Sequence, residues 1–470
     1  MAYKTTTTRG NFERPESLGG VSPGLRRFVK TAETVSDGEN LPFTQIIRFL
    51  AWNAPLMLIF WNVPVIGRIH SVLTLLLGVS YALRDERPAR ASFVIAYIAS
   101  CEILWRGTEA SLLSEYGKYA SILLSILLIL RFRLLGKNLL WPLLFLILLL
   151  PGVLIAPFDR QAISYQLAGP VAIAFLSMAF GGITFTRKEI QQLLLATIAP
   201  AIAMGMFVIF MLLTNDVQFS GRGEDEAITG GIGANQVSSA LALGATAAFF
   251  YIFLSGKDRR VRYTMIASSL GLLTLAVLTF SRGGVWTALG AAGLGSLFMI
   301  RDRRLFFRIL GSLVLLGLLG YFVLFPIVNR ITGGTGVTRF SSLDTTDRDV
   351  LFEIDYQVFL DNPVLGVGVG QSPKYHFSAF GYPKPTHTEY SRLLAEHGFF
   401  GIAVMVLWAL VFFARVLSRQ NPLWKGISVG FTAWALMFMV HSATRMVAPS
   451  FAFGLAAASL LPDEEQPQDD

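Results

Sequence analysis

The feature that most restricts how this chain can fold is a succession of long apolar stretches separated by short polar loops. A helix needs about 20 mostly apolar residues to cross the roughly 30 Å hydrocarbon core of a bilayer. By that length we count about fourteen candidates, near residues 46–63, 66–83, 91–107, 111–131, 138–156, 163–183, 189–213, 235–254, 263–280, 284–300, 305–327, 398–417, 425–441 and 446–461. Only 15% of the residues are charged, against roughly 25% in soluble domains. We therefore expect an all-α fold, a polytopic transmembrane helix bundle of about 12–14 spans.

The basic residues predict how this bundle is oriented. Lysines and arginines gather in alternate loops, near residues 84–90, 131–137, 187–188, 257–262, 301–308 and 415–425. By the positive-inside rule these loops are cytoplasmic, and both termini then lie inside. Because the net charge of +8 comes mostly from these clusters, we do not expect nucleic-acid binding.

The same pattern divides the chain into five parts. Residues 1–45 are polar and contain no apolar core of a signal peptide, so we expect a disordered cytoplasmic tail. Residues 46–327 and 398–461 hold the transmembrane helices, and 462–470 form an acidic cytoplasmic tail. Residues 328–397 form a large, partly helical outer loop, in which Val350, Leu351, Ile354 and Val358 have helical spacing. That spacing predicts a helix from Asp349 to Asn362.

The most informative polar stretch ends this loop, with the sequence PTHTEYSRLLAEHGFFG from Pro385 to Gly401. Thr386 and Glu389 have the spacing of a capping box, so we expect a helix that begins at His387 and ends at Gly398. An imidazole in the first turn of a helix feels the positive end of the helix dipole. We therefore expect His387 to be neutral and able to accept a proton.

Three arginines lie on the outer side, where the positive-inside rule does not account for them: Arg222, Arg282 and Arg348. Each one alone could extend toward lipid headgroups. Together they would stabilise the charge on a departing pyrophosphate, since guanidinium groups bind phosphate with two parallel hydrogen bonds. His387 could then take the proton of an incoming hydroxyl. An enzyme facing outward has no nucleotide triphosphate, so its substrate must already be activated on a lipid.

The other polar features of the sequence give weaker predictions of function. The five histidines, at positions 70, 376, 387, 397 and 441, have no Cys or carboxylate companions at ligand spacing, so we expect no metal site. The GVGVG sequence at 366–370 lacks the spacing of a phosphate loop and is interpreted as turns and close packing. The single cysteine, Cys101, is expected to be a buried small hydrophobe. Glu102, inside an apolar stretch, is either a functional intramembrane acid or a buried structural contact.

Four motifs resemble those of one family. They are His387-Thr388 followed after nine residues by GFFG at 398–401, TFSRGG at 279–284, DNPVLGVGVG at 361–370, and Arg222 followed after ten residues by Gly233 and then Asn235. In this order they are similar to the motifs of the O-antigen ligase and polymerase superfamily, the membrane glycosyltransferases of bacterial surface polysaccharides.

The resemblance implies a GT-C-like fold in the bacterial inner membrane and an undecaprenyl-pyrophosphate-linked glycan as donor. It implies transfer at the periplasmic face, without metal or cofactor, to a hydroxyl of a glycan or of lipid A core. It assigns His387, Arg282 and Arg222 to catalysis, and Arg348, Asn235, Thr388 and Ser281 to substrate binding. Thr388 stands where ligases commonly have Asn, Ser or Gln, although it keeps a hydroxyl. Chain-length regulators and other polysaccharide-assembly proteins are candidate partners.

The sequence leaves four functions open. The first is a polymerase of lipid-linked repeat units for O-antigen or exopolysaccharide, and the second a ligase that moves the finished glycan to lipid A core. The third is a lipid or solute transporter, which would gain support if Glu102 lined a water-filled path. The fourth is a nonenzymatic scaffold of an assembly complex.

Overall fold

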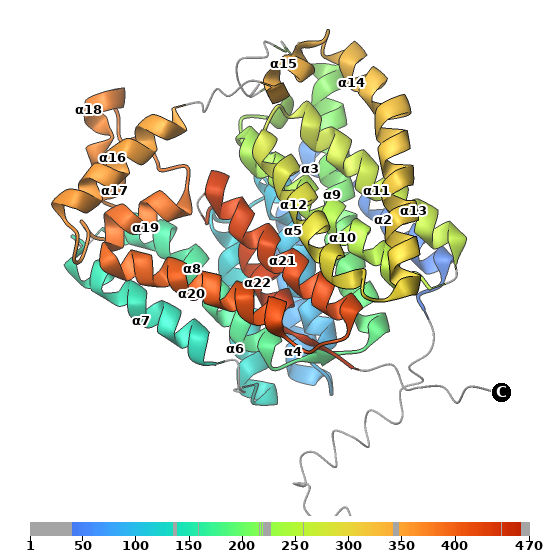
Figure 1. The fold of residues 1–470 in the computed structure, drawn as a ribbon, viewed down its shortest axis with the longest axis horizontal. Coiled ribbons are helices and arrows are strands. Elements are labelled where there is room, and N and C mark those ends of the chain that lie inside the picture. The colour runs from blue at the N-terminus through green and yellow to red at the C-terminus, as the bar shows by residue number, and fades with distance from the viewer. Residues whose placement is uncertain are drawn as a thin grey trace, which may run out of the picture. The chain divides into compact units, whose positions relative to one another are not determined.

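The fold is built from helices almost throughout, as the apolar stretches predicted. The computed structural model describes residues 40–134, 139–157, 159–215, 217, 219, 227–256, 258–341, 347–442 and 444–461. Figure 1 traces these elements. They are α2 (Phe43–Asn53), α3 (Leu56–Asn62), α4 (Pro64–Arg84), α5 (Ala89–Gly107), α6 (Tyr116–Phe132), α7 (Leu140–Ile155), α8 (Arg160–Gly181), α9 (Arg187–Thr214), the short η1 (Ala227–Thr229), α10 (Ala234–Leu254), α11 (Arg259–Leu278), α12 (Arg282–Met299), α13 (Arg303–Leu319), η2 (Gly320–Leu324), α14 (Phe325–Ile331), α15 (Thr335–Ser341), α16 (Arg348–Asp361), α17 (Ser372–Tyr375), α18 (Phe377–Phe380), α19 (Glu389–His397), α20 (Phe399–Leu417), α21 (Pro422–His441) and α22 (Ala448–Ala457).

Each predicted apolar stretch coincides with helix, but fewer helices than expected can span a membrane by themselves. Within the described residues, nine are long and apolar enough: Phe43–Asn62, Pro64–Arg84, Ile163–Gly181, Arg187–Thr214, Ala234–Leu254, Arg259–Leu278, Leu305–Ile331, Phe399–Leu417 and Pro422–His441. Leu140–Ile155 and Ala448–Ala457 are apolar but shorter. The all-α polytopic bundle is confirmed, and the exact number of spans stays a prediction.

Small residues let the central helices approach one another. A Cβ on Gly283 would lie 2.3 Å from the His441 ring, and one on Gly290 2.3 Å from Met437 Sδ, so α12 needs both glycines to pack on α21. A Cβ on Gly284 would meet Ser238 Oγ at 2.3 Å, which brings α12 equally close to α10. Helices inside membranes commonly associate through such small residues. The two glycines of the TFSRGG motif therefore serve packing.

Two strands of two residues each are the exception to an all-helical chain in the described ranges. β1 (Thr184–Phe185) pairs in parallel with β2 (Ser459–Leu460), with Thr184 opposite Ser459. The pair joins the connection between α8 and α9 to the segment after α22, and the buried Phe185 side chain packs against Phe180 at 6.1 Å between ring centroids.

The segment predicted as the outer loop is largely helical. Helices α16 to α19 lie together beside the start of α20 (Figure 1). The helix predicted from 349 to 362 is confirmed as α16, which buries Leu351 and Val358 as its spacing indicated. Val350, expected on the same face, is instead 43% exposed. The boundaries of the five predicted parts stay predictions; α2 begins at Phe43, within the predicted tail, and residues 1–39 and 462–470 lie outside the described residues.

Candidate functional site

The helix after His387 begins two residues later than predicted, and the predicted capping box is wrong. α19 starts at Glu389, and its N-cap is Thr388, whose hydroxyl accepts from Ser391 N at 3.1 Å. The Thr386 hydroxyl lies 3.1 Å from Ser372 Oγ instead, and the Glu389 carboxylate pairs with Arg392. The predicted end is confirmed, since Gly398 is the C-cap with φ +59°. His387 therefore precedes the helix.

His387 is neutral at physiological pH, as predicted, but for a different reason. Burial and then the positive charges of Arg445, Arg348 and Lys384 lower the pKa of its imidazole to about 4. Asp347 acts in the opposite direction, and its carboxylate is held by Lys384 Nζ at 2.9 Å. An imidazole beside three cations keeps its lone pair free to take a proton, and the same cations favour a bound anion.

Three residues predicted to bind substrate are joined by hydrogen bonds. Asn235 Oδ1 accepts from Ser281 Oγ at 2.7 Å and from Arg348 Nη2 at 3.2 Å. These side chains come from the amino ends of three helices: Asn235 from α10, Ser281 from the N-cap of α12 and Arg348 from the first position of α16. Because unpaired amides and the helix dipole make such ends attractive to anions, their convergence at Arg348, whose charge also acts on His387, suits a phosphate-bearing ligand.

Glycines and strained turns bring these helix ends together. Gly233, with φ +97°, is the N-cap of α10, and Phe280, with φ +58°, turns the chain sharply between α11 and α12. Positive φ is costly for a residue other than glycine. The Phe280 ring stacks on Phe219 at 4.9 Å between centroids, which helps hold this conformation. The turns and close packing predicted for GVGVG are confirmed, because Gly366 and Gly368 have positive φ and abut Glu396 and Ala156.

Sequence reasoning missed two cations of this site, Lys384 and Arg445. Lys384 lies three residues before His387. Arg445 lies in the short connection between α21 and α22, and its Nη2 donates to Thr386 O at 2.8 Å. The signal that singled out Arg282, an arginine at the outer end of a predicted span, was also present at Arg445.

Buried carboxylates and their partners hold the connection that carries Arg445. Glu102 Oε2 accepts from Val447 N at 2.7 Å, and Arg106 Nη1 donates to Arg445 O at 3.3 Å. Glu389 Oε2 accepts from Thr444 N at 3.1 Å. Glu102 is 2% exposed, and its bond to the backbone of Val447 fits the interpretation of a buried structural contact.

A second buried cluster fixes the chain before His387. His376 Nε2 lies 3.0 Å from Asp355 Oδ1, and its Nδ1 lies 2.5 Å from Lys384 O. Burial alone would lower the pKa of His376, but the hydrogen bonds to Asp355 and to Lys384 O outweigh it and raise that pKa. Both ring nitrogens thus lie against oxygens that can accept a hydrogen bond, which favours the protonated imidazole. Asp355 Oδ2 also accepts from Ser391 Oγ at 2.8 Å, which ties α16 to α19.

The other residues predicted for the site are Arg282, Thr388 and Arg222, and the structure describes two of them. Arg282 is half-buried at the first position of α12, next to Ser281. The Thr388 oxygen caps α19, a task that Asn and Ser also perform well, and its binding role stays a prediction. Arg222 lies outside the described residues. Among the described residues, no three His, Cys, Asp or Glu side chains are grouped so that they could hold a metal ion.

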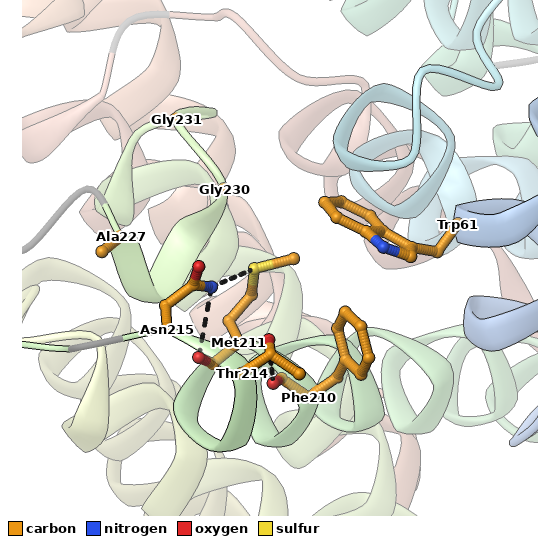
Figure 2. A pocket seen from close by; sticks show the side chains of 8 residues that line it. All are labelled: Trp61, Phe210, Met211, Thr214, Asn215, Ala227, Gly230 and Gly231. Carbon is orange, nitrogen blue, oxygen red and sulfur yellow. Dashed lines mark hydrogen bonds between the residues drawn. The ribbon is translucent and has the colours of Figure 1, made fainter.

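A pocket opens between α3, α9 and the turn that precedes α10. Its volume is about 540 Å³, and Figure 2 shows the lining from α3, α9 and the η1 turn: Trp61, Phe210, Met211, Thr214, Asn215, Ala227, Gly230 and Gly231. The Trp61 ring meets Phe210 edge-on at 5.6 Å between centroids. Asn215 Nδ2 and Thr214 Oγ1 bond to backbone oxygens of α9 at 3.3 and 2.8 Å, as Figure 2 shows. The wall is thus mostly apolar and aromatic.

Comparison with known proteins agrees with the resemblance seen in the motifs. Residues 266–406 match the family model described as O-antigen ligase, which confirms the predicted relation to the O-antigen ligase and polymerase superfamily. The matched range contains Ser281, Arg282, Arg348 and His387. Asn235 and Arg445 lie outside it. No curated protein matches the chain.

Proposed function

Starting from the O-antigen ligase family domain at residues 266–406, we propose that the chain is a glycosyltransferase of the bacterial inner membrane that polymerises lipid-linked repeat units at the periplasmic face. The observation that carries this proposal is the half-buried His387, whose pKa is lowered to about 4 by burial and by the charges of Arg445, Arg348 and Lys384. Glycosyl transfer from a pyrophosphate-linked donor requires a proton acceptor close to a cluster of cations that binds the leaving anion.

In the proposed reaction, an acceptor hydroxyl attacks the anomeric carbon of the sugar attached to undecaprenyl pyrophosphate. A new carbon–oxygen bond forms, and the bond from that carbon to the pyrophosphate oxygen breaks. The lipid pyrophosphate leaves with the electron pair, and its negative charge is stabilised by the cations around His387. The acceptor proton goes to the His387 imidazole.

Binding of the donor also raises the pKa of the His387 imidazole. The three cations lower the pKa of His387 when the site is empty of anions. A bound pyrophosphate offsets their charge, so the imidazole gains proton affinity when the donor is in place. His387 therefore becomes a stronger base in the complex than in the free enzyme.

A ligase is the second candidate function, favoured by the description of the matched family. It would use the same donor and the same residues but a lipid A core acceptor. Thr388 does not separate the two functions, because its oxygen caps α19, and the residues common in ligases include good caps.

Reconstitution of the purified chain in liposomes with undecaprenyl-pyrophosphate-linked repeat units tests the proposal. We expect chains of several repeats, formed in the presence of a chelator and lost in His387→Ala and Arg282→Ala variants that remain in the membrane at normal levels. Transfer to added lipid A core without elongation would favour the ligase. Full activity in both variants would overturn the mechanism.

A further inference from the structure

Helix α16 has an exposed apolar face that its role at the site does not explain. It turns Leu351, Asp355 and Val358 inward. Phe352, Tyr356 and Leu360, spaced by four residues, are 45%, 41% and 49% exposed on another face, and the half-buried Phe359 adjoins them. We refer to Phe352, Tyr356, Phe359 and Leu360 as the aromatic stripe. A stripe of this kind outside the transmembrane helices needs a partner.

The rings of the stripe form a continuous row. Phe352 and Tyr356 stack with centroids 6.3 Å apart and planes 3° apart, and Tyr356 lies 6.3 Å from Phe359. Phe359 meets Phe399 edge-on at 5.9 Å. Phe399 is the first residue of α20, one of the helices able to span the membrane. The row thus runs from the surface of α16 onto a transmembrane helix.

The exposed side of α20 continues the row toward the membrane interior. Phe399, Val406, Leu410, Phe413 and Leu417 are its exposed large side chains, and their spacing places them along one side of the helix. On a spanning helix such a side faces acyl chains. The start of α20 is fixed against the end of α16 by a hydrogen bond from Phe399 N to Pro363 O at 2.8 Å. The stripe therefore adjoins the level at which α20 enters the bilayer.

We propose that the aromatic stripe lies in the headgroup region of the bilayer, so that α16 is an interfacial helix anchored on the lipid surface. Phe and Leu gain from insertion at this depth, and Tyr is enriched there because its ring is apolar and its hydroxyl stays wet. The neighbouring exposed residues of α16 are Glu353, Gln357 and Asp361. They give this helix an acidic polar face, so its adhesion rests on apolar area and not on attraction to anionic lipids.

The anchor also bears on the candidate site. α16 begins with Arg348, which bonds to Asn235 and lowers the pKa of His387. A helix held on the lipid surface keeps this guanidinium at the depth where the pyrophosphate of a membrane lipid lies. A sugar could also stack on exposed rings, but the continuity with the lipid-facing side of α20 favours the bilayer.

Spin labels at neighbouring positions test the anchor without any measurement of activity. In a Cys101→Ala background, Tyr356→Cys and Gln357→Cys are labelled with a nitroxide in the full chain, in nanodiscs of phosphatidylethanolamine and phosphatidylglycerol. Collision with dissolved oxygen, which concentrates in lipid, is compared with collision with a water-soluble nickel chelate. We expect the oxygen-to-nickel ratio to be several-fold higher at 356 than at 357.

Leu360→Cys provides a second position on the stripe in case the label at 356 disturbs folding, and the same high ratio is expected there. Equal ratios at the stripe positions and at 357 would overturn the proposal and leave a water-borne ligand, such as a glycan, as the partner of the stripe. Because the test needs no substrate, its result does not depend on whether the proposed glycosyl transfer is correct.

Discussion

At the scale of single residues, the proton affinity of His387 is the property on which the proposed chemistry depends. Burial and three cations lower its pKa to about 4. The sequence predicted a neutral imidazole through the helix dipole, whereas the structure places His387 ahead of α19. The sequence could not predict either cause, because burial of the imidazole depends on tertiary packing, and Arg348 and Arg445 come from distant parts of the chain and act on His387 only in the fold.

The dependence of activity on pH should report this environment. The acid limb of kcat/KM, which follows the free enzyme, is expected near pH 4, well below the ordinary pKa of about 6.5 for histidine. The acid limb of kcat, which follows the complex with donor, is expected at higher pH because the bound anion offsets the cations. Rates of transfer from about pH 3 to pH 8 measure both limbs. Coincident limbs near pH 6.5 would show that neither burial nor the cations lower the pKa of His387.

Arg445 should matter as much as the arginines singled out from sequence. Arg445→Met would remove the proposed charge-assisted contact with the donor and should lower kcat/KM roughly 10- to 100-fold, the equivalent of about 1.4–2.7 kcal/mol. It should also raise the pKa of His387. The exposed Arg419 offers a matched control. It follows the carboxyl end of α20, whereas His387 and α19 lie before the amino end of that helix, so Arg419→Met should leave kinetics unchanged. Equal kinetics in both variants would remove Arg445 from the site.

At the scale of elements, the existence of α16 and α19 was predictable, whereas the start of α19 was not. Local spacing predicted both helices and the end of α19 at Gly398. The T-x-x-E pattern failed because partners outside it compete for both of its side chains. Thr386 lies against Ser372, and Glu389 binds Arg392 and Thr444 N.

The buried Arg392 should be among the residues that stabilise this region most. It is 2% exposed and pairs with Glu389 and, at 2.8 Å, with Glu396. Arg392→Met would leave two buried carboxylates without their cation, at a cost of about 3–5 kcal/mol. Thermal unfolding in detergent should show a clearly lowered Tm. A Tm equal to that of the Arg419→Met protein would indicate that the ion pairs add nothing.

At the scale of the whole molecule, the bundle could be predicted from apolar length alone, because the bilayer sets the length of each span. Two of the motifs do meet, since Ser281 bonds to Asn235, and the assignment of the site to these segments stays a prediction. The contacts of α12 with α10 and α21 could not be predicted, since they depend on how Gly283 and Gly284 fit against His441 and Ser238.

The sidedness predicted from charge stays a prediction, and cysteine labelling can test it. The one native cysteine, Cys101, is buried and should not react with a thiol reagent. In intact cells, a membrane-impermeant thiol reagent should label Gln357→Cys, on the surface of α16. It should label Arg260→Cys, at the start of α11, only after the cells are permeabilised. The reverse pattern would place the candidate site on the cytoplasmic side.

The most direct test of the central claim is the initial rate of glycan transfer by His387→Gln in the same liposomes as the unaltered chain. Glutamine keeps a polar side chain of similar length but cannot accept the proton. Because a positioned general base contributes about 100- to 10,000-fold, we expect the rate to fall by at least about 100-fold while binding of the lipid-linked donor is retained. A rate within a few-fold of the unaltered chain would contradict the assignment of His387 as the base.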